Sequence, residues 1–368
     1  MQPLEGVKVL DFSTLLPGPM CTLLLADAGA DVIKIERATG DDMRDYEPKS
    51  GFDSINFCLL NRGKKSIVAD LKDPGIRKKI EALIAEADVI VEQFRPGVMD
   101  RLGLGYNAAK AINPGIIYCS ITGFGQFGPY AQVAAHDMNY QARTGMVRLS
   151  SDPSGAPVVP PVLTADLAAG AYPAVMNILL GLRTRDKTGS GCHLDISMSD
   201  NLFPLMYWGL GAGWAAGQWP RGGDELVTGG SPRYQIYQTA DDKYLAAAPL
   251  EDKFWNNFLT VLGASELEHI DNPALVKASI AKIIAQHPAA YWLNKFEGKD
   301  TCVTEVIGLE QAVSDPHFKE RGVFSRGLQT PGGARIPALP TPISSVFLSG
   351  NTENTSPRLG AHTEEILK

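Results

Sequence analysis

The sequence lacks the features that define several large classes of protein. It has no C-x-x-C pair, and its five cysteines are scattered, which fits a reducing compartment better than a disulfide framework or a zinc ribbon. Positive charge is not in excess, since 34 Lys and Arg residues stand against 41 Asp and Glu residues, for a net charge of −7. A general nucleic-acid binder needs a basic surface, so the composition argues against that class.

Long apolar runs are also missing. Residues 202–217 form the most apolar stretch, which is shorter than the ~20 residues that a membrane-spanning helix needs. Residues 162–182 are interrupted by Asp166, Pro173 and Asn177. The N-terminus has neither the basic region nor the apolar region of a signal peptide. We therefore expect a soluble cytoplasmic protein with neither a nucleic acid nor a membrane as its partner.

Several chemical motifs are absent as well. The sequence contains no P-loop, no histidine pair with zinc-ligand spacing and no G-x-S-x-G nucleophile. Gly123, Gly125 and Gly128 form one G-x-G-x-x-G, but Pro129 follows where a dinucleotide site needs a helix. Such a site also needs an acidic residue about 20 positions further on, and here the first acidic residue in that window is Asp152. We interpret this segment as a flexible glycine loop, and we expect neither a metal nor a separate bound cofactor.

What is present is a regular alternation of strand and helix patterns in the first half of the chain. The expected strands are residues 7–12, 31–35, 66–71, 89–91 and 116–121, and the expected helices are 17–25, 73–84 and 107–112. This alternation is typical of an α/β fold, in which crossover helices connect the strands of a parallel sheet.

The second half of the chain does not continue this regular alternation. A long helix is predicted over residues 164–183, with Thr164 as its N-cap and Asp166 in its first turn. Residues 218–233 are rich in Gly, Pro and charge and read as a linker or functional loop. The patterns that follow predict a hairpin of 234–239 with 244–248, helices at 251–263 and 273–296, and a short C-terminal helix at 364–367.

Two ionisable residues stand out, His136 and Asp166. Taken alone, a single histidine is more often structural than catalytic, and an acidic residue in a first turn is more often a helix cap. An apolar helix start that holds one aspartate can also be a catalytic site, because the free N–H groups of the first helical turn can bind an oxyanion.

A set of segments, in order along nearly the whole chain, forms a further pattern: residues 4–12, 17–19, 24–37, 61–66, 87–89, 94–99, 123–126, 187–191 and 359–363. Together these segments resemble the family III CoA-transferases, and most closely the α-methylacyl-CoA racemases among them. The racemases are also similar at 135–140, which reads Ala-His-Asp-Met-Asn-Tyr, and at 229–234 and 250–255. Two residues depart from the family pattern: Asp252 replaces a common proline, and Arg233 stands where an aromatic residue is frequent.

The resemblance implies a two-base proton transfer at C2 of a 2-methylacyl-CoA. His136 and Asp166 would act on opposite faces of an enolate, and N–H groups at the start of the Asp166 helix would stabilise its oxygen. Glu251 would orient the histidine, with Asp137 assisting. Two alternatives remain: a CoA-transferase in which Asp166 is a covalent nucleophile, and a non-catalytic acyl-CoA-binding protein.

The same resemblance implies where the CoA part of the substrate binds. Arg37 would contact adenine and phosphate, and Arg101 would meet a phosphate. The remaining expected contacts are Ala69, Asp70, Leu71, Lys72, Gln93, Phe94, Arg95, Pro96, Gly97, Ala135, Met138, Asn139 and Tyr140.

The implied architecture has a Rossmann-like large domain with a parallel sheet, plus a smaller α+β domain. The expected bounds are 1–195 for the large domain, 196–224 for a linker, 225–325 for the small domain and 326–368 for a segment that returns to the large domain. Two chains would interlock as a homodimer, so that His136 and Asp166 of one subunit meet Glu251 of the other.

Overall fold

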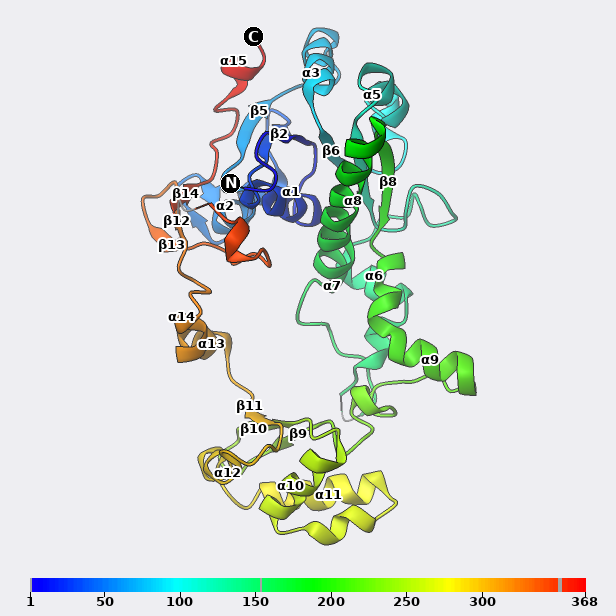
Figure 1. Cartoon of the computed structure of the whole chain (residues 1–368), viewed down its shortest axis with the longest axis vertical. Coiled ribbons are helices and arrows are strands. Elements are labelled where there is room, and N and C mark those ends of the chain that lie inside the picture. The colour runs from blue at the N-terminus through cyan, green and yellow to red at the C-terminus, as the bar shows by residue number, and fades with distance from the viewer. Residues whose placement is uncertain (1, 153, 350–352) are drawn as a thin grey trace. The chain divides into compact units, whose positions relative to one another are not determined.

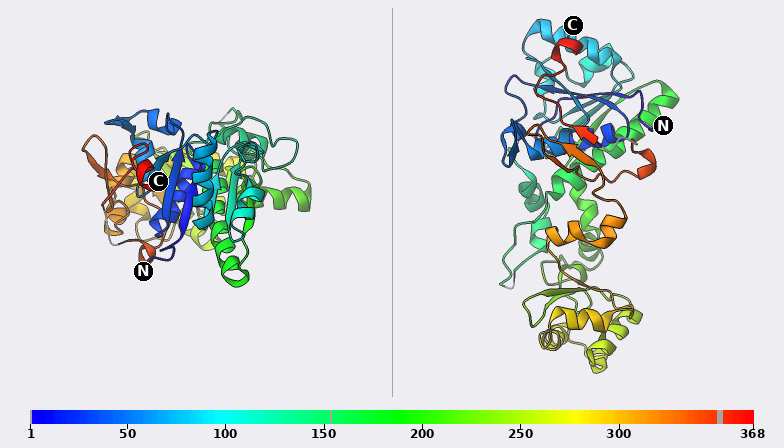
Figure 2. Two further views of the ribbon diagram at one scale, coloured as in Figure 1. Left: turned by 90° about the horizontal axis from the view of Figure 1, so that it is seen from above. Right: turned by 90° about the vertical axis from the view of Figure 1, so that its left-hand side faces the viewer.

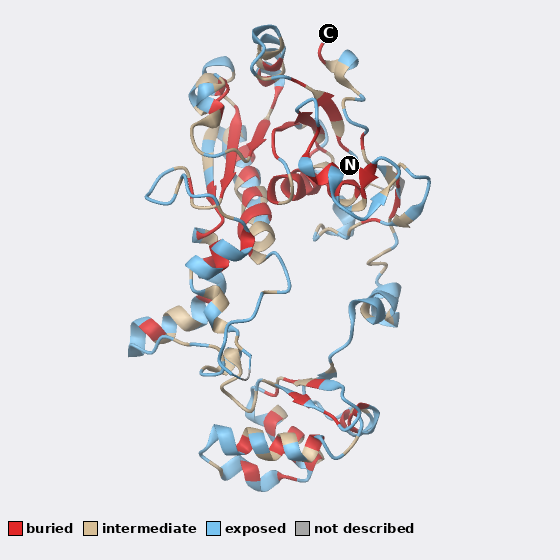
Figure 3. Ribbon diagram, turned by 180° about the vertical axis from the view of Figure 1, so that it is seen from behind, coloured by how far each residue is buried: buried red, intermediate tan, exposed pale blue. Residues whose placement is uncertain are grey.

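The computed structural model describes residues 2–152, 154–349 and 353–368. The chain divides into two compact units, each with its own buried core (Figure 3). Unit 1 consists of Met1–Thr144, Pro161–Leu205 and Pro316–Lys368, and unit 2 of Gly145–Pro160 and Met206–Asp315. Residues 326–368 thus belong to unit 1, and so do residues 316–325, which the sequence analysis assigned to the small domain. Residues 145–160, which the sequence analysis assigned to the large domain, belong to unit 2.

Unit 1 is built on a six-stranded sheet in the order β5-β2-β1-β6-β7-β8, and all its neighbouring strands are parallel (Figures 1 and 2). Its strands are β1 (Lys8–Asp11), β2 (Asp31–Glu36), β5 (Lys65–Val68), β6 (Val89–Glu92), β7 (Ile117–Thr122) and β8 (Cys192–Ser197). This confirms the predicted α/β class with a parallel sheet. Counted along the chain, the order is 3-2-1-4-5-6, the Rossmann order, whose switch point lies between β1 and β6.

Helices cover both faces of this sheet, because successive residues of a strand point to opposite sides. On one side Leu10 packs in the core that contains Ile80 and Ile84 of α3 (Pro74–Glu86). On the other side the next residue, Asp11, accepts a hydrogen bond from Thr22 of α1 (Pro17–Asp27). The helices of unit 1 are α1 (Pro17–Asp27), α2 (Ile55–Asn61), α3 (Pro74–Glu86), α4 (Val98–Arg101), α5 (Tyr106–Ile112), α6 (Asp137–Arg143), α7 (Thr164–Asp166), α8 (Tyr172–Thr188), α14 (Pro316–Glu320) and α15 (Thr363–Ile366).

Two small sheets complete unit 1, one of β3 (Lys49–Ser50) and β4 (Asp53–Ser54), the other of β12 (Gly327–Gln329), β13 (Arg335–Pro337) and β14 (Glu353–Thr355). The predicted C-terminal helix is confirmed as α15, which returns to lie beside β5 and α3 (Figure 2). It is fixed there by the Val68 N–H, which donates to Thr363 Oγ1 at 2.9 Å, and by Lys79, whose ammonium donates to the Leu367 carbonyl at 2.6 Å.

The predicted long helix is present and runs further than expected, from Thr164 to Thr188, with a π-helical turn at Leu167–Ala171 between α7 and α8. The helix meets length and hydropathy criteria for a membrane span, but 44% of its most apolar window is buried inside the structure. Gly181 explains the close packing, since a Cβ there would lie 3.1 Å from Cγ2 of Ile117 in β7. The predicted N-cap is wrong: the helix begins at Thr164 itself, and no side-chain cap comes from the preceding residue.

Among its described residues, unit 2 contains an antiparallel sheet in the order β11-β10-β9 and five α-helices. The elements are α9 (Tyr207–Ala216), β9 (Gln235–Gln238), β10 (Tyr244–Ala247), α10 (Asp252–Leu262), α11 (Pro273–Ile284), α12 (Ala289–Phe296), β11 (Val303–Glu305) and α13 (Leu309–Ser314). The predicted hairpin is confirmed as β9–β10. The single helix predicted over 273–296 is wrong, because Pro288 restricts the residue before it and separates α11 from α12.

Candidate active site

A cavity of about 410 Å³ in unit 1 opens at the switch point of the sheet. Its walls come from the segment after β1, the segment after β6, the end of β7 with the loop that follows it, α6 and Asp166. The lining residues are Leu15, Pro17, Gln93, Phe94, Arg95, Pro96, Ile121, Thr122, Gly123, Phe124, Ala131, Val133, Ala134, Ala135, His136, Asn139, Tyr140, Asp166 and Met198. Open α/β sheets bind ligands outside the carboxyl ends of their strands at this position.

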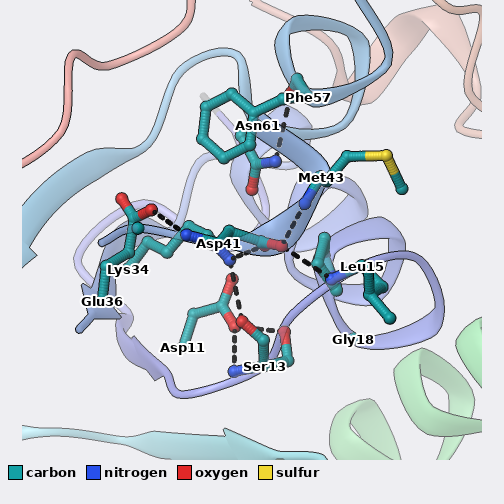
Figure 4. A network of polar contacts seen from close by, with 12 residues as sticks. Asp11, Ser13, Leu15, Gly18, Lys34, Glu36, Asp41, Met43, Phe57 and Asn61 are labelled. Atoms are coloured by element: carbon teal, nitrogen blue, oxygen red, sulfur yellow. Dashed lines mark hydrogen bonds and ion pairs between the residues drawn. The ribbon is translucent and has the colours of Figure 1, made fainter. Parts of the chain in front are cut away.

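The segment after β1 is held by a buried polar network (Figure 4). Leu15 has a left-handed backbone, with φ 62°, and its N–H donates to Asp41 Oδ1 at 3.1 Å. Three residues further on, the Gly18 N–H donates to Gln93 Oε1 at 3.0 Å and so joins the segments after β1 and β6. The left-handed region is unfavourable for leucine, and such backbone persists only where its surroundings impose it.

Buried charges form the base of this network. Lys34 lies 2.9 Å from Asp41 Oδ2, and the Lys64 ammonium donates to Asp11, Thr22, Asn61 and the Pro19 carbonyl. Burial opposes ionisation of Asp11, but Lys64 and Lys34 outweigh it and lower the pKa of this carboxyl to about 2. Both lysines are fully buried, so they contribute no charge to the surface and act on the pocket through the loop that they support.

A second buried carboxyl supports the segment after β6. Glu92 is 4% exposed, its Oε2 accepts the Phe94 N–H at 2.8 Å, and Phe94 lines the pocket. Burial raises the pKa of Glu92 to about 7, although the hydroxyl of Ser120 opposes the increase.

His136 occupies the N-cap position of α6 and is exposed. Its backbone N–H donates to Asn139 Oδ1 at 3.0 Å, which fixes the main chain at the start of the helix and leaves the ring out of the cap. On the same helix Tyr140 is buried, and its hydroxyl donates to the Ala135 carbonyl at 2.7 Å. His136 therefore lines the pocket from a fixed backbone.

Asp166 enters the same pocket from the end of α7. None of the hydrogen bonds among the described residues ends on its carboxyl oxygens. Burial raises the pKa of Asp166 to about 7, and the negative charge of Asp137 adds to the increase. A carboxyl in this state is poised to give or take a proton near neutral pH.

Asp137 performs the capping that was expected of Thr164. Its buried Oδ1 accepts the Ala165 N–H at 2.7 Å and the Asp166 N–H at 3.0 Å. The Thr164 and Leu167 N–H groups donate to carbonyls of the preceding turn. The expectation that N–H groups at the start of this helix receive the enolate oxygen is therefore wrong, because these donors are already used.

The glycine loop after β7 has a packing role. A Cβ at Gly123 would lie 2.3 Å from Cε1 of Tyr140, so only glycine lets the tyrosine ring approach the strand end. Phe124 packs edge-on against the same ring at 5.3 Å. Helix α6 begins only at Asp137, so the G-x-G-x-x-G segment is a loop, as the sequence indicated, and lacks the helix of a dinucleotide site.

The residues expected to bind CoA fall into two groups. Gln93, Phe94, Arg95, Pro96, Ala135, Asn139 and Tyr140 line the pocket. The other expected contacts do not line the pocket. Arg37 follows β2, and the segment 69–72 follows β5. Gly97 and Arg101 belong to the turn and helix after β6, and Met138 is exposed on α6. Arg37 and residue 69 are neighbours across the sheet, since the Ala69 N–H donates to the Glu36 carbonyl at 2.9 Å. The Arg37 guanidinium forms an ion pair with Asp42.

Glu251 lies in unit 2, where it is exposed at the N-cap of α10. Its expected contact with His136 stays a prediction. The two residues that depart from the family pattern contact each other beside it: Arg233 donates to Asp252 Oδ1 at 2.6 Å and to the Leu250 carbonyl at 2.9 Å. Arg233 thus binds the residues on either side of Glu251.

The sequence analysis did not name ten of the pocket residues as site residues: Leu15, Pro17, Ile121, Thr122, Gly123, Phe124, Ala131, Val133, Ala134 and Met198. The Pro-Gly-Pro that follows the first strand was the available signal for the first two, because it begins α1 at the switch point. In the part of the chain that the structure describes, no group of three or more His, Cys, Asp or Glu residues is arranged to hold a metal ion.

A Rossmann-ordered sheet with a ligand pocket at its switch point, lined by an exposed histidine and a half-buried aspartate, defines a class of α/β proteins equipped for acid–base or acyl chemistry. Residues 4–363 match the sequence profile of CoA-transferase family III, and the chain belongs to this family.

Among its relatives, the alpha-methylacyl-CoA racemase of Homo sapiens is 34% identical over 99% of this chain and 92% of that protein. The acetyl-CoA:oxalate CoA-transferase of Acetobacter aceti is also 34% identical, over 93% of this chain and 89% of that protein. A crystal structure of a CAIB/BAIF family protein from Brucella suis is similar over 100% of both chains, with a TM-score of 0.83 and 32% sequence identity. Racemases and transferases are thus equally similar, so identity alone does not choose between the two reactions.

Proposed function

We propose that the protein is an α-methylacyl-CoA racemase that inverts C2 of a 2-methylacyl-CoA thioester. The observation that carries this proposal is that His136 and Asp166 line one pocket, with the pKa of Asp166 raised to about 7. Inversion without oxidation needs one group that removes the α-proton and another that returns a proton to the opposite face. A carboxyl that titrates near neutral pH and an accessible imidazole supply such a pair.

The step balances without a further reactant. One group takes the proton from C2, the electron pair moves into the thioester carbonyl to form the enolate, and the other group gives a proton to C2. The enolate oxygen needs a hydrogen-bond donor. Since Asp137 already occupies the N–H groups of Ala165 and Asp166, that donor has to come from elsewhere around the pocket.

The arrangement of the strand ends supports CoA as the carrier. The expected CoA residues follow β5, β2 and β6, and the strands β5, β2, β1 and β6 are successive neighbours in the sheet. A long ligand can therefore extend along the carboxyl edge from Arg37 to the pocket. We further propose that the protein is a cytoplasmic, interlocked homodimer acting on lipid-derived thioesters without a separate cofactor, and that Glu251 of one chain orients His136 of the other.

One observation favours a second candidate, a CoA-transferase. The A. aceti relative with this activity is as similar as the human racemase. In that reaction Asp166 would attack the thioester to form an acyl anhydride and release the CoA thiolate, which would attack the aspartyl carbonyl, release the first acid as a carboxylate and leave CoA on Asp166. The new carboxylate would then attack this aspartyl thioester to form a second anhydride, and the released CoA thiolate would attack its acyl carbonyl to give the new acyl-CoA and free Asp166.

The deciding experiment is mass spectrometry of 2-methylacyl-CoA incubated with the protein in D₂O, with a free carboxylate acceptor added to a parallel sample. We expect uptake of one α-deuteron with the CoA ester intact, and we expect His136→Ala to abolish exchange of at least one enantiomer. Transfer of CoA to the acceptor without deuterium uptake, together with an aspartyl adduct trapped by hydroxylamine, would overturn the racemase.

A further inference from the structure

Asp137 is bonded to both residues of the candidate acid–base pair: a peptide bond joins it to His136, and its side chain accepts a hydrogen bond from the main-chain N–H of Asp166. It follows His136 directly and is 4% exposed. Its Oδ1 accepts two N–H groups of α7, one of which belongs to Asp166, and its Oδ2 accepts Nε2 of Gln141 at 2.5 Å. A single side chain therefore connects the start of α6 with the start of α7.

This connection replaces a local helix cap. The residue before α7 is Leu163, which has no side-chain acceptor, and Thr164 does not cap the helix. The π-helical turn that follows Asp166 interrupts the regular hydrogen-bond ladder of the long helix. The backbone at Asp166 is thus held on its N-terminal side by a residue from α6.

The same contact places two carboxyl groups near each other. None of the ion pairs among the described residues includes Asp137, so its charge is balanced by N–H donors, by the Gln141 amide and by the positive end of the helix. The titratable and charged residues that line the pocket with Asp166 are His136 and Tyr140, both from α6, and Arg95, after β6. Burial raises the pKa of Tyr140 to about 12, and Asp166 and Asp137 add to the increase, so the phenol stays neutral.

We propose that Asp137 is a positioning residue for proton transfer: its carboxylate fixes Asp166 relative to His136 and places a negative charge beside it. The positioning of Asp166 by Asp137 is argued from geometry alone, whereas the effect of Asp137 on proton transfer rests on the proposed racemase function. It follows that the Asp137 charge helps to keep Asp166 partly protonated near neutral pH, a state that suits an acid–base group better than a nucleophile, which must be ionised.

Three variants of the full-length protein separate these roles. Asp137→Asn keeps an oxygen that can accept the same two N–H groups but removes the charge, since Asn and Asp are equivalent as helix caps. Asp137→Ala removes both cap and charge. Gln141→Leu is the matched control, because it removes a partner of Asp137 and leaves the cap and the charge in place.

The first measurement needs no substrate. Infrared difference spectra against Asp166→Asn follow the protonation of the Asp166 carboxyl with pH. We expect Asp137→Asn to move the midpoint to lower pH by roughly half a unit or more, because a like charge is removed. Gln141→Leu should leave it in place. An unchanged midpoint in Asp137→Asn would overturn the electrostatic role.

The second measurement is α-proton exchange of 2-methylacyl-CoA in D₂O as a function of pH. In Asp137→Asn the acid limb of the pH–rate profile should move to lower pH by the same amount as the infrared midpoint. Asp137→Ala should lose at least tenfold in kcat, with the Kd of free CoA unchanged. Wild-type exchange in Asp137→Ala would overturn the positioning role. If the wild-type protein exchanges no α-proton, the racemase fails, and the infrared titration alone decides the role of Asp137.

Discussion

The raised pKa of Asp166 has a consequence for stability that can be measured without substrate. The ordinary value for this carboxyl is 3.8, and in the folded protein it is about 7. Between these values the folded state binds a proton that the unfolded state has released, so this group makes the free energy of unfolding fall as pH rises from about 4 to 7. Asp166→Asn removes the titration and should therefore stabilise the protein at pH 8.

The magnitude follows from the size of the shift. Each pKa unit corresponds to about 1.4 kcal/mol, so a displacement of about three units sets an upper bound of about 4 kcal/mol on the gain at pH 8. Of this gain in the free energy of unfolding, up to about 3 kcal/mol should develop as the pH rises from 5 to 8. For a domain of this size, each kcal/mol corresponds to roughly 2–4 °C in Tm.

The assay is calorimetry of the wild type and Asp166→Asn at both pH values. All five tryptophans lie between residues 208 and 292, inside unit 2, so their fluorescence marks the transition of that unit and helps to assign the other transition to unit 1. Asp186→Asn, at an exposed position on α8, is the control. The reasoning is refuted if Asp166→Asn changes Tm equally at pH 5 and pH 8, or lowers it at pH 8.

Further predictions concern the supports of the pocket. Lys64→Met should lower the free energy of unfolding by about 3–5 kcal/mol, because it removes the charged partner of the buried Asp11. This loss of stability should appear as faster hydrogen exchange in α1. Unchanged exchange in α1 would contradict the prediction. Gly123→Ala should force Tyr140 to move, at a cost of about 1–3 kcal/mol, and weaken CoA binding in calorimetric titration. Gly211→Ala is its control, since a Cβ there meets nothing within 4 Å; equal CoA affinity in both variants would count against the predicted movement.

The sequence was most informative where burial makes a strand apolar throughout. The predicted strands of the parallel sheet are present because such strands are covered on both faces and read as continuous apolar runs. The strand predicted over 66–71 ends earlier, at Val68, because the chain leaves the sheet there. The strand β8 was missed, since it lies at the edge of the sheet and carries the exposed His193 and Asp195 within Cys192–Ser197.

The polar interior was much harder to predict. Nothing in the local pattern indicates that Lys34, in the middle of β2, is fully buried, because its partner Asp41 belongs to a different element. The same limit applies to Asp137, whose two N–H donors lie 28 and 29 residues further along the chain. A periodic pattern reports on one element at a time, whereas these contacts exist only after two elements have packed.

The sheet and the acid–base pair contribute different parts of the site. The ends of β1 and β6 provide walls at the switch point, a position that the Rossmann order makes available to any ligand. The groups proposed to react come instead from α6 and α7, after β7, and Asp137 joins those two helices. Under either proposal Asp166 would be the reacting carboxyl, as a base in the racemase and as a nucleophile in the transferase. The choice between the reactions therefore depends on its neighbours, and a second carboxylate beside Asp166, with an accessible histidine in the same pocket, favours the transfer of protons.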